Sequence, residues 1–106
     1  VLARVFGYSG NDIIYGSNTT SSLWTERLYG SNGNDTIFGD AANGAVGYDR
    51  VAYNGPGSQR SDFVFTQNPD GSITAVNDTF GTDLLYGIDG IFFDESGEFV
   101  ETDALF

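Results

Sequence analysis

The sequence lacks cysteine, histidine and lysine, and these absences exclude much of the usual chemistry of active sites. Without cysteine, the chain can build neither a disulfide framework nor a thiolate zinc site. The absence of cysteine also excludes a thiol nucleophile, the absence of histidine excludes the serine triad and histidine-ligated zinc, and the absence of lysine excludes a Schiff base. Carboxylates, tyrosines and arginines remain, and we therefore expect that the chain is not an enzyme in its own right.

Basic side chains are scarce as well, with four arginines against fifteen acidic residues and a net charge of −11. This charge repels nucleic-acid phosphates and anionic lipids, so we expect no nucleic-acid partner. The same self-repulsion destabilises any compact state unless cations are bound to it. Because thiolate and imidazole ligands are absent, the sequence predicts a metal held by hard oxygen ligands.

Long apolar runs are also missing, and we find neither a signal-peptide pattern nor a stretch that could span a membrane. The chain starts at Val1 without a methionine, so we expect it to be a piece of a longer polypeptide. Its 106 residues suffice for one cooperative unit with a small core.

Glycine and aromatic residues, in contrast, are plentiful. The chain contains 15 glycines, 9 phenylalanines and 6 tyrosines. Glycine is therefore about twice as frequent as the average of about 7%. A flexible glycine-rich linker, however, would not carry so many aromatic rings. The combination is typical of glycine turns that connect short apolar strands.

An internal repeat of 23 residues organises the first half of the chain. Residues 7–29 align without gaps on residues 30–52. Within each copy, a nine-residue unit, GYSGNDIIY or GSNGNDTIF, is followed by a fourteen-residue unit that carries an acidic residue, an arginine and an aliphatic residue near its end. The spacing predicts stacked, structurally equivalent coils.

The two nine-residue units resemble the RTX nonapeptide G-G-x-G-x-D-x-U-x, in which U is a large aliphatic residue. In that family, six residues form a glycine-rich turn, the next three form a short strand, and two units make one coil. The resemblance implies an all-β fold with calcium as its cofactor. We expect a short right-handed parallel β-roll of about two coils over residues 1–60, with antiparallel capping strands over residues 61–106, folding as one cooperative unit.

The resemblance also implies which oxygens bind calcium. Glycine tolerates positive φ, so the turns can aim backbone carbonyls inward. Because stacked strands lie about 4.8 Å apart, Asp12 and Asp35 can both reach one ion at about 2.3–2.6 Å. Tyr8 and Ser31 depart from the motif, because they replace its second glycine. The candidate metal ligands on this ladder are Gly7, Ser9, Asp12, Ser31, Gly33 and Asp35.

Three further carboxylates are candidate ligands, and for each of them a surface role is the alternative. Glu26 and Asp49 occupy equivalent positions in the two fourteen-residue units, where they could share an ion with help from Asp40. Asp62 ends the turn that would continue the first ladder, although Arg60 replaces a glycine there.

From residue 61 the pattern changes to antiparallel hairpins, with turns predicted at residues 68–71 and around residues 94–97. The run GTDLLYGI resembles the segment that commonly follows RTX repeats and is expected to cap the roll. The predicted interior of the roll consists of Ile14, Leu28, Ile37 and Val51. The predicted apolar residues of the cap are Phe63, Phe65, Ile73, Leu84, Ile88, Ile91 and Phe93.

The function that these features predict is calcium-triggered folding after export. The resemblance implies a secreted, extracellular protein, and residues 103–106 resemble the acidic and apolar tail of type I secretion substrates. We expect the remainder of the parent polypeptide to be the partner of this module and to supply any activity.

The main alternative is an accessory module that binds an acidic polysaccharide, as in alginate-modifying enzymes that carry RTX modules. Arg4, Arg27 and Arg50 would stack into one outer column, with Trp24 as a platform for sugar rings. A column of this kind is also typical of a solvated face, and Trp24 could simply fold its loop over the roll. An ice-binding roll is disfavoured, because the outward turn residues form no repeated ladder.

Overall fold

The computed structural model describes residues 2–16, 25–39 and 48–106, and in these segments the regular structure consists of β-strands and two short 3-10 helices. The predicted all-β class is confirmed. None of the described segments forms a helix with the length and apolarity that a membrane span requires. The strands are β1 (Leu2–Phe6), β2 (Ile13–Tyr15), β3 (Thr25–Tyr29), β4 (Thr36–Phe38), β5 (Tyr48–Tyr53), β6 (Val64–Gln67), β7 (Ile73–Asn77), β8 (Gly81–Tyr86), β9 (Gly90–Phe93) and β10 (Glu98–Glu101), and the 3-10 helices are η2 (Arg60–Asp62) and η3 (Thr102–Leu105).

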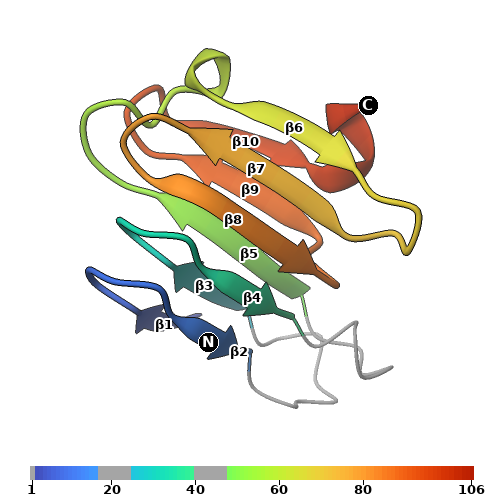
Figure 1. Cartoon of the computed structure of the whole chain (residues 1–106), viewed down its shortest axis with the longest axis horizontal. Coiled ribbons are helices and arrows are strands. Elements are labelled where there is room, and N and C mark those ends of the chain that lie inside the picture. The colour runs from blue at the N-terminus through green and yellow to red at the C-terminus, as the bar shows by residue number, and fades with distance from the viewer. Residues whose placement is uncertain (1, 17–24, 40–47) are drawn as a thin grey trace.

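The strands form two mixed sheets of five strands each (Figure 1). Sheet 1 has the order β1-β3-β5-β9-β10, and sheet 2 has the order β2-β4-β8-β7-β6. The repeat strands alternate between the sheets, so that β1 and β2 form a first coil and β3 and β4 form a second. A third coil begins with β5 in sheet 1 and is completed by β8 in sheet 2.

The strand register confirms the predicted period of 23 residues. β1, β3 and β5 are paired in parallel, which places Arg4 beside Arg27 and Arg27 beside Arg50. β2 and β4 are also parallel, with Ile14 opposite Ile37. Equivalent residues of successive coils therefore lie side by side.

The second half of the chain contains the predicted hairpins but continues the parallel pairing further than expected. β6 and β7 are antiparallel around the turn at 68–71, and β9 and β10 are antiparallel around the turn at 94–97. β8, however, is parallel to β4, and β9 is parallel to β5. The hairpin of β6 and β7 is thus an excursion, after which the chain returns to extend both sheets.

The core lies between the two sheets and includes the predicted interior positions of the repeats. Ile14, Leu28, Ile37 and Val51 are all buried. Of the apolar residues predicted for the second half, Leu84 is wrong, because Leu85 is the buried residue of β8. The register explains the error, since Leu85 lies opposite Ile37 whereas Leu84 lies opposite Thr36 on the other face. The remaining core residues are Tyr53, Phe63, Ile73, Ala75, Phe80, Ile88, Ile91, Phe93 and Val100, with Phe65 and Leu105 packed against them.

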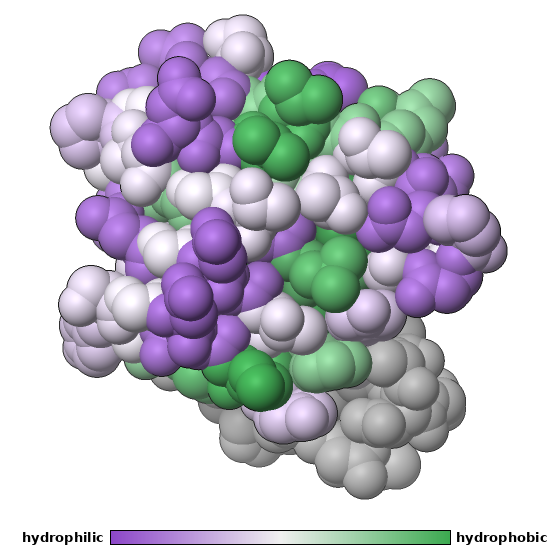
Figure 2. Space-filling model, viewed as in Figure 1, coloured by the Kyte–Doolittle hydropathy of each residue, from purple (hydrophilic) through white to green (hydrophobic). Residues whose placement is uncertain are grey.

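The outer face of sheet 2 carries a column of stacked rings. Phe38 lies between Tyr15 and Tyr86, with ring centroids 4.8 Å from each. Figure 2, viewed from the same side as Figure 1, shows hydrophobic residues in separate patches among polar ones. The distance of 4.8 Å between neighbouring ring centroids matches the separation of neighbouring strands, so one ring is repeated in each coil.

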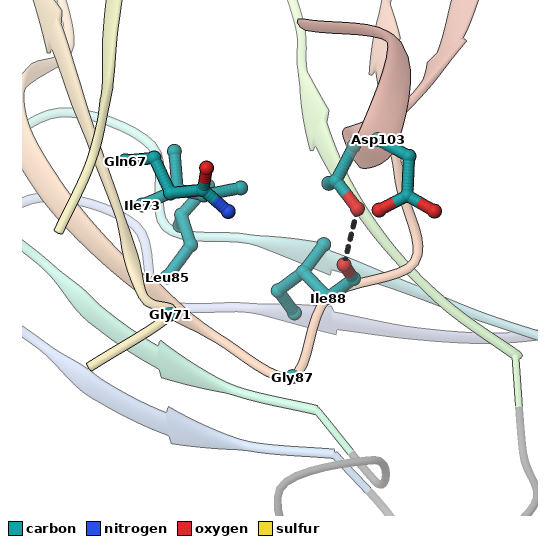
Figure 3. Close-up of a pocket in the computed structure, with 8 residues that line it drawn as sticks. Gln67, Gly71, Ile73, Leu85, Gly87, Ile88 and Asp103 are labelled. Atoms are coloured by element: carbon teal, nitrogen blue, oxygen red, sulfur yellow. Dashed lines mark hydrogen bonds between the residues drawn. The ribbon is translucent and has the colours of Figure 1, made fainter. Parts of the chain in front are cut away.

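The C-terminal segment is tied back onto the turn between β8 and β9. The Thr102 hydroxyl donates a 2.8 Å hydrogen bond to the carbonyl of Ile88, beside a cavity of about 180 Å³ (Figure 3). Leu105 in η3 packs against the core, whereas Phe106 is exposed. The expected role of residues 103–106 in secretion stays a prediction.

Candidate metal centre

The turns of the first two coils adopt the same backbone conformation despite their departures from the motif. Tyr8 and Ser31 have φ angles of 65° and 64°, a left-handed backbone conformation that residues other than glycine rarely adopt. Gly10 and Gly33, two residues further along, also have positive φ. The turn therefore keeps the conformation for which the motif uses a second glycine, at a local cost of about 1–2 kcal/mol per residue.

These turns are stacked in direct contact along the coil axis. A Cβ atom on Gly33 would overlap the carbonyl oxygen of Gly10, and one on Gly81 would lie 2.7 Å from the carbonyl oxygen of Gly33. The third coil thus presents Gly81 where the first two present Gly10 and Gly33. Glycine is required here by the close approach of neighbouring backbones.

A column of aspartates follows these glycines. The backbone N–H of Asp12 donates a 2.8 Å hydrogen bond to Oδ1 of Asp35, and the N–H of Asp35 donates a 2.9 Å bond to Oδ1 of Asp83. Each carboxylate therefore caps the turn of the preceding coil. Asp12 and Asp35 lie together as predicted, and Asp83 is a third member that the sequence reasoning missed.

The second carboxylate oxygen of both repeat aspartates is buried without a hydrogen-bond partner. Neither Oδ2 of Asp12 nor Oδ2 of Asp35 accepts a hydrogen bond from the described residues. Each of these oxygens lies beside a glycine, because a Cβ on Gly7 would be 2.7 Å from the first and a Cβ on Gly30 would be 2.5 Å from the second. A buried anionic oxygen without compensation is costly, so this arrangement fits a bound cation.

The ligand set suits calcium and depends on the backbone. Among the described residues, no three acidic side chains converge on one point, so carboxylates alone could not complete a coordination shell. Calcium takes six to eight oxygen ligands, and backbone carbonyls are common among them. The sequence prediction assigns such carbonyls to Gly7, Ser9, Ser31 and Gly33 in the glycine-rich turns, and this assignment stays a prediction.

A second pair of aspartates lies where the chain returns from sheet 2 to sheet 1. Asp49 is fully buried, and its N–H donates a 2.8 Å hydrogen bond to Oδ2 of Asp89. The backbone register places Glu26 opposite Asp49, as predicted, although its side chain lies outside the described part. Asp40, the predicted helper, lies outside the described residues as well. Asp89 was not predicted as a neighbour of Asp49.

The structure corrects the expectation for Asp62. This residue lies in η2, where its carboxylate accepts a 3.0 Å hydrogen bond from the N–H of Gln59. The place on the ladder after Asp35 belongs to Asp83 instead. The cause is the excursion through β6 and β7, which separates the equivalent aspartates by 48 residues instead of 23.

The backbone register places Arg4, Arg27 and Arg50 in one row, as predicted, and aromatic rings lie against the side chains of Arg27 and Arg50. The guanidinium carbon of Arg27 lies 4.9 Å from the ring centroid of Phe92, and that of Arg50 lies 5.6 Å from the ring centroid of Phe99. Both arginine side chains are only half-exposed. Trp24, the predicted sugar platform, lies outside the described residues.

Burial shifts the pKa of two carboxyl groups in the aspartate column. Burial raises the pKa of Asp83 to about 7, against the opposing effect of hydrogen bonds from the Asp35 N–H and the Tyr53 hydroxyl. Burial also raises the pKa of Asp35, and the neighbouring charge of Asp12 contributes to the same shift. In the absence of metal, the folded state therefore binds protons that the unfolded state releases above about pH 4.

The metal-free fold should consequently lose stability as the pH rises from about 4 to about 7, by an amount on the order of a few kcal/mol. Thermal unfolding in chelator at pH 5 and pH 7 would measure this loss. Asp83→Asn should reduce the difference, whereas Asp78→Asn, which removes the same charge at an exposed position, should preserve it. An equal pH response in all three proteins would contradict the assignment to Asp83.

Comparison with known proteins agrees with this geometry. The family model of the RTX calcium-binding nonapeptide repeat, which spans four copies, matches residues 4–19 and 25–44. These segments contain both turns, both repeat aspartates and β2 and β4. Among curated proteins, none matches the chain. Residues 4–19 and 25–44 therefore carry RTX nonapeptide repeats, and repeats of this family bind Ca²⁺.

Proposed function

We propose that this module is a short right-handed parallel β-roll that folds on calcium binding after export and closes the end of a roll in a larger secreted protein. The observation that carries the proposal is the pair of buried Oδ2 atoms on Asp12 and Asp35, each held beside a glycine. Two anions in this position keep the coils apart until a cation compensates them.

Asp12 and Asp35 would hold calcium together with turn carbonyls, and Asp49 with Asp89 would be the corresponding acidic pair on the opposite side. Calcium supplies positive charge and oxygen coordination, which offset the repulsion between carboxylates of successive coils. The residues themselves define the register, since each carboxylate of the column also caps a neighbouring turn. Binding and folding are therefore coupled.

The difference between the two ends of the molecule supports a terminal position in a longer roll. β1 and β2 are edge strands, and the first coil exposes large apolar side chains, namely Val5, Phe6, Tyr8, Ile13 and Tyr15. The other end is closed by the antiparallel strands β10 and β6. A preceding coil of the parent polypeptide would pair with β1 and β2 and cover these side chains.

Binding of an acidic polysaccharide is less well supported. Phe92 and Phe99 occupy one side of the guanidinium groups of Arg27 and Arg50, which leaves less of them for a ligand. The net charge of −11 also opposes the approach of a polyanion. We therefore retain the calcium-dependent structural role as the function of the module.

Substitution of the ladder aspartates tests this proposal. Asp35→Ala should weaken calcium binding more than Asp12→Ala, because it removes a ligand and also leaves the Asp12 N–H without its acceptor. An unpaired buried donor costs about 1–3 kcal/mol, so calcium affinity should fall on the order of 10-fold or more.

Calorimetric titration with calcium measures both effects, and Asp78→Ala is the matched control, since it removes one negative charge from an exposed site. Calcium binding that is the same in all three variants and the unmodified chain would refute the stacked-turn site.

A further inference from the structure

The third coil departs from the first two at one position of sheet 1. Val5, Leu28 and Val51 are equivalent in the strand register. Gly7 and Gly30 follow Val5 and Leu28 by two residues, and the equivalent residue after Val51 is Tyr53. The first two coils thus have a glycine where the third has one of the largest side chains in the chain.

The Tyr53 side chain fills the space that the glycines leave open. Its exposed fraction is 1%, and its ring packs against Phe63 and Phe80 with centroid distances of 4.5 and 5.3 Å. These contacts join β5 to the residue that precedes β6 and to the turn before β8. The ring is therefore fixed in place by the core of the second half.

The Tyr53 hydroxyl acts on the aspartate column. It donates a 2.8 Å hydrogen bond to Oδ2 of Asp83, whose Oδ1 already accepts the N–H of Asp35. The corresponding Oδ2 atoms of Asp12 and Asp35 have no hydrogen-bond partner among the described residues. Asp83 is therefore the member of the column whose two oxygens are both satisfied by the chain itself.

We propose that Tyr53 ends the calcium ladder, because its hydroxyl takes at the third coil the place that calcium has beside Asp12 and Asp35. This inference rests on the proposed function of the first two coils. As a consequence, the third coil closes without metal, and β5 and β8 provide a preformed edge on which the second coil and then the first can stack when calcium binds.

Hydrogen exchange of the full chain in chelator tests the inference, with Tyr53→Phe as the variant. In the unmodified chain, the amides of β8 should be protected in chelator more strongly than those of β2. Tyr53→Phe keeps the ring but leaves Oδ2 of Asp83 unpaired, so protection of β8 should fall by at least about 10-fold. Tyr86→Phe, which removes a hydroxyl on the outer face of the same strand, should leave protection unchanged.

Two further measurements test the role of Tyr53. The calorimetric number of calcium ions should be the same for Tyr53→Phe and the unmodified chain, because the phenylalanine ring still fills the gap. The cost of Tyr53→Phe should shrink when Asp83→Asn is already present, since the hydroxyl then faces a neutral amide. Equal protection of β8 and β2 in chelator, or loss of protection in Tyr86→Phe of the same size, would overturn the inference. If the unmodified chain binds no calcium, the proposed function is refuted. The role of Tyr53 is then still tested by the protection of β8 in chelator, compared between Tyr53→Phe and the unmodified chain.

Discussion

Removal of calcium at neutral pH should unfold the first two coils, with loss of their β signal in far-ultraviolet circular dichroism. Without a cation, Oδ2 of Asp12 and Oδ2 of Asp35 are buried without compensation, in a chain whose net charge is −11. The apolar interior of the first two coils is small, with Ile14 as the buried residue of β2 and Ile37 as that of β4, and it cannot offset this repulsion. Return of calcium should restore the β signal.

The dissociation constant should fall in the range of extracellular calcium modules, roughly 10⁻⁴ to 10⁻³ M. At this affinity the chain should stay open at the low calcium concentration of a cytosol and fold at the higher concentration of an extracellular medium. Magnesium at the same concentration is the control, because it requires a smaller octahedral site and gives up its water reluctantly. Protected amides in β2 and β4 in chelator would show that the coils fold without metal, contrary to this expectation.

The sequence predicted the repeat half of the fold well, for a physical reason. A gapless period of 23 residues means that each coil meets an equivalent coil, so alignment alone determined that Ile14 lies beside Ile37 and Arg27 beside Arg50. The inward positions followed from the alternation of side chains along a strand. The predicted hairpin turns likewise depended on local residues, such as Asn68 and Gly71.

The third coil could not be predicted by the same reasoning, because its two strands are separated by the hairpin of β6 and β7. A fixed period led to Asp62, whereas the chain reaches the ladder only at Asp83. A weak signal was present, since GTDLLY repeats the glycine, the aspartate and the large aliphatic residue of GNDTIF at the same spacing. Recognition of Tyr53 required the three-dimensional register, because nothing in its local sequence marks it as a partner of Asp83.

Deletion of the chain after Arg60 should abolish folding of the repeats even in millimolar calcium. The deletion removes β8 and β9, which are the parallel neighbours of β4 and β5, and with them the buried side chains of Leu85 and Ile91. Each such side chain contributes roughly 1.5–3 kcal/mol when fully buried. The Asp35 N–H also loses its acceptor on Asp83. Two coils alone fall below the number that a solenoid generally needs for stability, about three repeats or a cap.

Circular dichroism and calorimetric calcium titration of residues 1–60 measure this loss, and removal of Phe106 alone is the control, because that side chain is exposed and outside the sheets. The control should fold and bind calcium as the full chain does. Cooperative folding of residues 1–60 in calcium would mean that two ion-bound coils stabilise each other without the third. We expect instead that the second half of the chain must be present before the two repeat coils can fold. The buried rings that pack around Tyr53 belong to residues 61–106, so the repeats have a hydrophobic core to stack on only when these residues are present.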